Sequence, residues 1–112
     1  MRKITETTAT AFMNHTPMTQ ANTAVIVSDN EVCMTLHGHT IAKYDKTTKN
    51  LWFNSCGYQS QTTKERLNGI LKVYGFINTN IIQRNGQWYI ISEDDLCNTT
   101  KREFLDNVWV AI

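Results

Sequence analysis

The strongest local signal in the chain lies in residues 59–75, QSQTTKERLNGILKVYG, where most features predict one helix. Thr62 and Glu65 fit a capping box, because the threonine hydroxyl can accept from an amide three residues on while the glutamate reaches back. Apolar residues then recur at helical spacing and form one stripe: Leu67, Ile70, Leu71 and Tyr74. Gly75 stands where a helix commonly ends in a left-handed residue. Gly69 costs about 1 kcal/mol relative to alanine inside a helix, and one interpretation is that another backbone approaches closely there. Because one helix cannot bury its own stripe, we expect a sheet to cover it.

Length and composition predict a single domain over residues 1–112, with a core of useful size. Apolar residues make up 41% of the chain, and no apolar run approaches the length of a membrane-spanning helix. Arg2 and Lys3 form an early basic pair, but no apolar segment follows them. We therefore expect no signal peptide, no membrane association and a cytoplasmic location.

Three cysteines, Cys33, Cys56 and Cys97, are odd in number and widely spaced, which favours reduced thiols over a disulfide framework. The formal net charge is +1. This balance argues against a dedicated nucleic-acid binder and excludes the strongly negative surface of a DNA mimic.

The first half of the chain predicts a helix followed by a β-meander. Residues 3–14 carry apolar and threonine side chains at helical spacing, and Thr16-Pro17 would end that helix. Alternating or β-branched runs then predict four strands, at residues 24–27, 31–37, 40–44 and 51–55. Gly38 interrupts the second run, as a bulge or turn would.

The second half predicts a hairpin with strands 81–84 and 87–91, because Asn85-Gly86 suits a two-residue turn. Residues 100–107 are ambiguous: a second capping-box pattern favours a short helix over 100–106. The alternative, which we prefer, is a small hairpin that joins 103–105 to 108–110 through Asp106-Asn107. The predicted fold is α+β: an antiparallel meander with one main packed helix, an N-terminal helix and a C-terminal hairpin.

The start of the main helix is the best candidate for a functional site. Free amides of a first helical turn accept anions, and hydroxyl, basic and aromatic side chains surround them: Tyr58, Thr62, Thr63, Lys64, Arg66 and Lys72. The simpler interpretation is that Glu65 satisfies the cap and repels an anion, while the basic residues form an ordinary solvated face.

A metal or thiol site is the second candidate. His37, His39 and Cys33 would share one face of a continuous strand, and Cys56 or His15 could add a ligand. Gly38 between the histidines argues against this, and no third group marks Cys33 and His37 as a nucleophile pair. The acidic residues 93–95 are contiguous and are most simply a solvated loop. We therefore predict no metal, no cofactor and no catalytic residue.

Trp52, Trp88 and Trp109 each occur on a predicted strand. Strand aromatics can stack on bases in single-strand binders, but the stripe of the main helix needs cover. We therefore expect the tryptophans to serve the core.

Four motifs in the same order resemble a family of small proteins encoded by tailed bacteriophages and prophages: KITE at 3–6, LHGHTIA at 36–42, TTKERLN at 62–68 and QRNGQWYI at 83–90. The chain departs from that pattern at His39, where the family often has asparagine, and at Tyr58, where it often has tryptophan. The resemblance spans most of the chain and implies a phage origin and expression inside an infected bacterium. It implies no catalytic residue.

Three functions follow as hypotheses. The first is a non-enzymatic phage accessory protein that binds a host or phage protein in the host cytoplasm, for example to modulate or inhibit a host factor. It rests on small size, balanced charge and the lack of a catalytic constellation. The second is weak nucleic-acid binding through the basic face of the helix at 62–75. The third is a small metal- or thiol-dependent enzyme that uses His37, His39 and Cys33.

Overall fold

A computed structural model describes residues 2–57, 60–76, 78–104 and 108–110. Two helices and nine strands follow one another in these residues: α1 (Lys3–Met13), β1 (Met18–Gln20), β2 (Thr23–Val27), β3 (Glu31–Leu36), β4 (His39–Asp45), β5 (Asn50–Phe53), α2 (Gln61–Val73), β6 (Thr79–Arg84), β7 (Gln87–Glu93), β8 (Thr99–Glu103) and β9 (Val108–Val110). Neither helix has the length and apolarity needed to cross a membrane.

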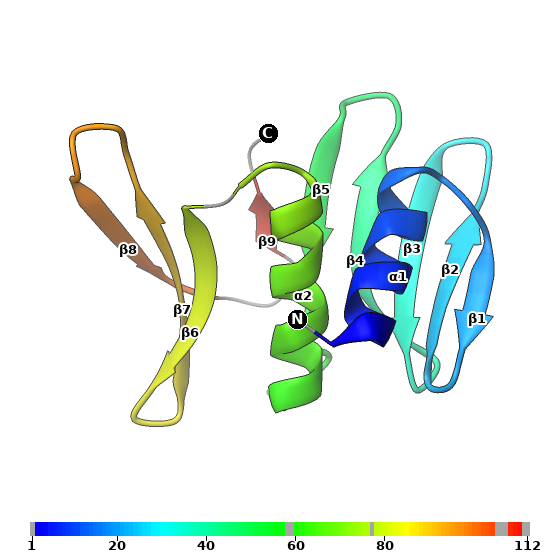
Figure 1. Ribbon diagram of the computed structural model, residues 1–112, viewed down its shortest axis with the longest axis horizontal. Coiled ribbons are helices and arrows are strands. Elements are labelled where there is room, and N and C mark those ends of the chain that lie inside the picture. Colours follow the sequence, from blue (N-terminus) through cyan, green and yellow to red (C-terminus); the bar gives the residue numbers. More distant parts are fainter. Residues whose placement is uncertain (1, 58–59, 77, 105–107, 111–112) are drawn as a thin grey trace.

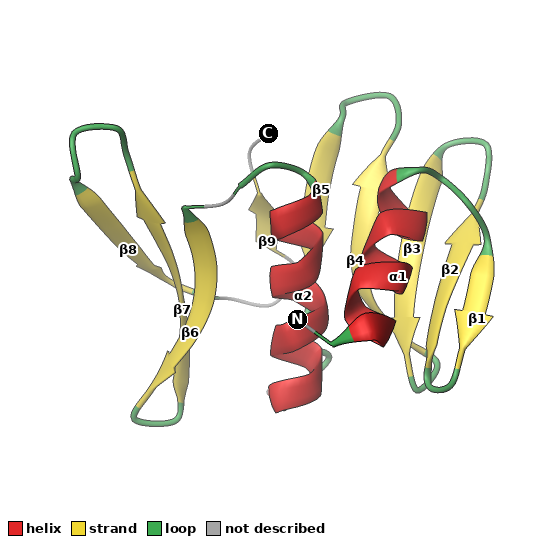
Figure 2. Cartoon of the chain, viewed as in Figure 1, coloured by secondary structure: helices red, strands yellow, loops and turns green. Residues whose placement is uncertain are grey.

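The strands form two antiparallel sheets. One has six strands in the order β1-β2-β3-β4-β5-β9, and the other has three in the order β6-β7-β8. Figure 1 shows α1 and α2 over one face of the larger sheet, with α2 between that sheet and the smaller one. The meander β2 to β5, the two helices and the β6–β7 hairpin confirm the predicted α+β fold (Figure 2). Strand β1, which follows Pro17, was not predicted.

Helix α2 covers the sheet as predicted, because its stripe is buried. Leu67 and Ile70 are 0% exposed and Leu71 is 1% exposed. Full burial of each such side chain stabilises the fold by about 1.5–3 kcal/mol. The fourth member, Tyr74, is half-buried and stacks on Tyr44 of β4 with ring centroids 5.7 Å apart.

The two ends of α2 differ in how well they were predicted. The cap is Ser60, whose hydroxyl accepts from the Thr63 amide at 3.1 Å, so the prediction that Thr62 caps the helix is wrong. Ser60 is the last residue with extended backbone angles, and the helix has already begun at Thr62. The C-terminus ends as predicted: Gly75 has a φ of 89°, and the amide of Phe76 donates back to the Leu71 carbonyl at 2.8 Å.

Helix α1 forms where it was predicted and packs against α2. Its fully buried residues are Thr5, Thr8, Ala9 and Phe12. Two of these are threonines, and the Thr8 hydroxyl donates to the Ile4 carbonyl at 2.7 Å within the helix. The side of α1 that meets α2 is therefore partly polar, which bears on the ion pairs described below.

The C-terminal residues pair differently from both predictions for 100–107. The Asn85-Gly86 turn forms, with φ of 53° and 77°. However, β8 pairs with β7 of the smaller sheet, and β9 pairs with β5 of the larger one. A helix over 100–106 and a hairpin joining 103–105 to 108–110 are therefore both wrong, because β8 pairs with the preceding strand β7 while the edge of β5, distant in sequence, takes up β9. The turn expected at 106–107 lies outside the described residues.

Candidate functional site

The structure divides the six residues predicted at the start of α2 among different places. Lys64 and Lys72 line one groove, whereas Thr62 and Thr63 line a separate pocket. Arg66 is only 2% exposed, and Tyr58 lies outside the described residues. The predicted set is therefore not one surface.

Arg66 is a buried connection between elements and not part of an exposed basic face, so that prediction is wrong. Its Nε donates to Thr23 Oγ1 of β2 at 3.1 Å, and its Nη1 donates to Thr5 Oγ1 of α1. The same Nη1 lies 3.2 Å from Glu65 Oε1. The buried threonine hydroxyls offer oxygen acceptors that compensate for removing the guanidinium from water. Arg66 thus ties α2 to both α1 and β2.

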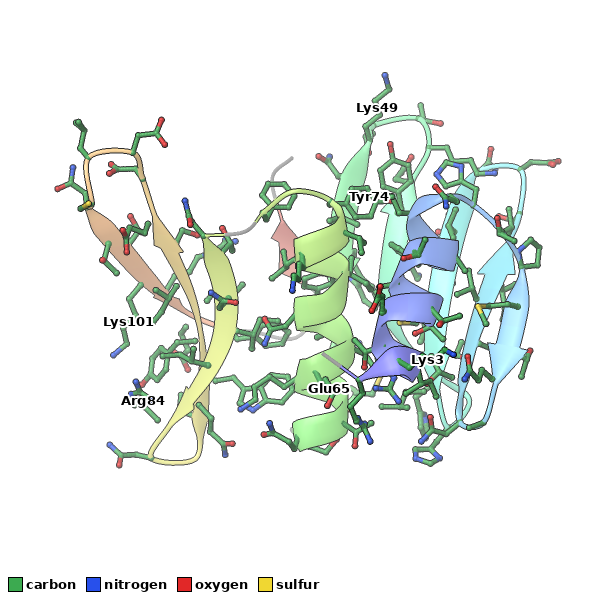
Figure 3. All side chains as sticks on the ribbon, viewed as in Figure 1. Lys3, Lys49, Glu65, Tyr74, Arg84 and Lys101 are labelled. Carbon is green, nitrogen blue, oxygen red and sulfur yellow. The ribbon has the colours of Figure 1, made fainter. Side chains whose placement is uncertain are left out.

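Glu65 belongs to the same network and does not form the predicted capping box. Burial by itself raises the pKa of Glu65, but hydrogen bonds from Arg2 and Thr5 and the charges of Arg2 and Arg66 lower it below the usual value. Arg2 Nε lies 2.7 Å from Glu65 Oε1, and Figure 3 shows this glutamate beside the start of α1. Its negative charge is consequently matched by two guanidinium groups.

A groove of about 400 Å³ runs between α2 and the start of the smaller sheet. Its lining is mainly polar: Gln61, Lys64, Glu65, Asn68, Gly69, Lys72, Phe76, Thr79 and Asn80. The two lysines are eight residues apart on one helix, a rise of about 12 Å. Within the described residues neither lysine forms an ion pair. Because Arg2 and Arg66 neutralise the Glu65 carboxylate, the remaining charge that lines the groove is positive.

Asn68 holds the two walls of this groove together. Its Nδ2 donates to the Ile81 carbonyl at 3.0 Å, and its Oδ1 accepts from the Ile81 amide at 2.7 Å. Both backbone groups belong to one residue of β6, so a single side-chain amide provides hydrogen-bond partners for its N–H and its carbonyl. The adjacent Gly69 is buried and also lines the groove.

A second pocket, of about 410 Å³, lies at the other side of the α2 start. Its lining includes both predicted histidines and the start of the helix: Leu36, His37, His39, Ile41, Ser55, Cys56, Ser60, Thr62 and Thr63. His37 and Gly38 have φ of 51° and 81° and form the turn between β3 and β4. The histidines therefore do not share a continuous strand face.

Cys33 is separated from those histidines. It alternates with the buried Val32 and Met34 of β3 and so faces away from the helices. Its Sγ lies 3.6 Å from Glu31 Oε1, and burial, together with that carboxylate, raises the pKa of the Cys33 thiol to about 11. A thiolate nucleophile is strongly disfavoured there.

The other proposed metal ligands are also dispersed. His15 packs against the ring of Tyr44, with centroids 5.4 Å apart, and Cys56 Sγ donates to the Thr40 carbonyl at 3.1 Å. In the part of the chain that the structure describes, no three His, Cys, Asp or Glu side chains are grouped to hold a metal ion. The sequence set His37, His39 and Cys33 is not one site.

Trp88 serves the core, as expected: it is 0% exposed and meets Phe104 edge to face. Trp52 is 9% exposed but lies outside the main core cluster, because it alternates with Leu51 and Phe53 of β5. Lys43 Nζ lies 4.8 Å from its ring. The side chain of Trp109 lies outside the description.

Sequence reasoning missed the groove because its second wall, β6, comes from a later segment.

Comparison with known proteins places the chain in a phage family. A family model described as Kyanoviridae Gp96 protein matches residues 1–111. No curated protein matches, and no solved structure matches. Because the family match extends over nearly the whole sequence, it covers both sheets and the groove. The chain therefore belongs to the Kyanoviridae Gp96 protein family, a family of phage proteins.

Proposed function

We propose that this phage protein is a non-enzymatic accessory protein that binds a host or phage protein in the host cytoplasm. The proposed contact is the α2–β6 groove, which would hold an acidic segment of the partner. One observation carries the proposal: Lys64 and Lys72 line the same groove and have no ion-pair partner among the described residues, while Glu65 beside them is neutralised by Arg2 and Arg66.

The remaining lining suits a polypeptide. Gln61 and Asn80 supply amide groups that can hydrogen-bond a backbone, and the half-buried Phe76 supplies an apolar surface. Both lysine ammonium groups can reach carboxylates on a segment laid along the helix. Such pairs steer association and set specificity more than they raise affinity.

A nucleic-acid partner is less well supported. Affinity for nucleic acid comes mainly from several phosphate contacts, and the burial of Arg66 leaves the face of α2 with two lysines. The formal net charge of the chain is +1. The separation of Cys33 from His37 and His39 likewise removes the residues on which a thiol or metal enzyme was based.

The test is affinity capture from lysate of infected host cells with a double variant, Lys64→Glu with Lys72→Glu. The wild type is expected to retain a discrete protein that the variant loses, because reversed charges repel an acidic segment. The matched control is Lys3→Glu with Lys49→Glu, which has the same net charge but changes exposed lysines away from the groove (Figure 3). If the control variant still captures the same protein, the position of the lysines, and not the total charge, decides binding.

Two results would contradict the proposal. One is capture of the same proteins by the groove variant and the wild type. The other is release of the captured material by nuclease treatment, which would transfer the groove to the nucleic-acid hypothesis. Thermal unfolding of all three proteins checks that loss of capture is not loss of fold.

A further inference from the structure

The turn between β7 and β8 is a rigid, exposed tip. The Asp94 carboxylate accepts from the amides of Leu96 and Asn98, each at 2.9 Å, and from Asn98 Nδ2 at 3.2 Å. The Asp94 amide in turn donates to the Asn98 carbonyl at 3.0 Å. These bonds, led by the one from the Asn98 backbone, lower the pKa of Asp94. The tip is thus held in one shape without any partner.

This tip displays a large apolar side chain among acids. Leu96 is 81% exposed, more than Ile26 at 55%, the other large exposed hydrophobic residue in the described chain. Glu93 and Asp95, which precede it in the chain, are also exposed. Figure 1 shows the turn at the end of the smaller sheet, pointing away from α2. The turn therefore combines exposed carboxylates with an exposed leucine, and these are the negative charge and the apolar side chain that the groove requires of its ligand.

We propose that the acidic segment held by the groove is the β7–β8 tip of a second copy of this chain, so that copies associate head to tail. The inference rests on the proposed function of the groove. Leu96 would lie on Phe76, while Glu93 and Asp95 would pair with Lys72 and Lys64. The carboxylate of Asp94 stays within the turn, where it is already bonded.

The argument for a second copy is charge complementarity within one molecule. The tip offers exposed carboxylates beside an exposed leucine. The groove offers two lysines, unpaired within the part of the chain that the structure describes, together with apolar and amide groups. The two surfaces are different, so the contact is heterologous and leads to a ring or an open chain of copies. A turn seated in a groove is a small interface, which favours weak and reversible association.

Sedimentation of the full chain over a range of concentrations at low salt tests this. We expect the average mass to rise above the 12.9 kDa of one copy, roughly doubling as the concentration passes on the order of 0.1 mM. Salt should reverse the rise, because the charges are at the surface. Leu96→Ser and Asp95→Lys should each shift the required concentration upward by about tenfold or more.

Charge exchange makes the test specific. Asp95→Lys with Lys64→Glu in one chain restores complementarity, so association should return, whereas Asp29→Lys with Lys49→Glu, a matched exchange at exposed turns, should behave like the wild type. A wild type that stays monomeric at every concentration, or association that Asp95→Lys leaves unchanged, overturns the inference. If lysate capture still depends on Lys64 and Lys72 in that case, the proposed function stands and only the identity of the partner fails.

Discussion

The two sheets are attached to α2 in different ways. The larger sheet receives the apolar stripe of the helix and also the buried Arg66 network, which reaches α1 and β2. The smaller sheet meets α2 through β6, where Asn68 bonds both backbone groups of Ile81. Arg66 and Asn68 are two positions apart, which places them about 200° apart around the helix. One helix therefore carries a buried charged contact on one side and a side-chain amide contact on the other. Buried residues of the smaller sheet, among them Ile81 and Trp88, also belong to the same apolar core as the stripe of α2.

This difference indicates where the molecule is rigid and where it can bind. On the Arg66 side, the polar atoms are used in bonds between elements. On the Asn68 side, a groove lies beside the contact between α2 and β6. Substituting Arg66 or Asn68 should weaken one of the two attachments and leave the other in place.

The largest effect is expected for Arg66→Met. The substitution leaves the Thr5 and Thr23 hydroxyls without their guanidinium donor and Glu65 with Arg2 as its remaining cation. Breaking one side of a buried charged network costs about 3–5 kcal/mol, measured as the free energy of unfolding in urea. Lys64→Met on the same helix is the control and should change it by about 0.5 kcal/mol or less. Equal losses for the two variants would show that Arg66 does not hold α1, α2 and β2 together.

Asn68→Ala should have a smaller and more local effect. It leaves the amide and carbonyl of Ile81 without their side-chain partner, a cost of about 1–3 kcal/mol. Hydrogen exchange should quicken in β6 and β7 and stay slow in β3 and β4, because the larger sheet keeps its own contacts. Asn80→Ala, an exposed neighbour on β6, is the control. Uniform acceleration in both sheets would mean that they open as one unit.

Acid should weaken the Arg66 side before the Asn68 side. The pKa of Glu65 in the folded protein lies below its usual value of 4.5, so its contribution to stability is complete above that value and is lost as pH falls through the folded pKa. Urea unfolding measured from neutral pH down to below that pKa should show this loss. Glu65→Gln should flatten that part of the profile. An unchanged profile would remove Glu65 from the network.

The smallest effect concerns reactivity and leaves the fold intact. Cys33 faces away from the helices with a pKa raised to about 11 by burial and by Glu31, whereas Cys97 is exposed at the β7–β8 tip. Alkylation followed by peptide mass spectrometry should modify Cys97 first and Cys33 slowly, because the thiolate is the reacting form. Glu31→Gln should speed the reaction of Cys33. Faster labelling of Cys33 than of Cys97 in the wild type would contradict the raised pKa of the Cys33 thiol.

The predictions that succeeded depend on neighbours in sequence. Asn85-Gly86 turned the chain as expected, since both residues tolerate positive φ wherever they occur. Gly75 ended α2 for a similar reason. The Thr62 cap failed because Ser60, two residues earlier, also offers a hydroxyl, and local pattern does not rank the two.

The predictions that failed depend on distant partners. Arg66 was assigned to an exposed face because nothing near it in sequence reveals that Thr5 and Thr23 would supply acceptors. The hairpin expected to join 103–105 to 108–110 does not form, because β9 pairs with β5, far earlier in the chain, while β8 pairs with the preceding strand β7. The groove was missed because its walls, α2 and β6, meet only in the folded chain.

Periodicity and turn chemistry were enough to specify the α+β class, the main helix and the strands of the meander, because these act over a few bonded residues. The folded arrangement alone settled which charges are buried, which lysines share a groove and which sheet each C-terminal strand joins. Those outcomes follow from burial and hydrogen bonding between segments far apart in the chain, and their free energies exist only once the segments have packed together.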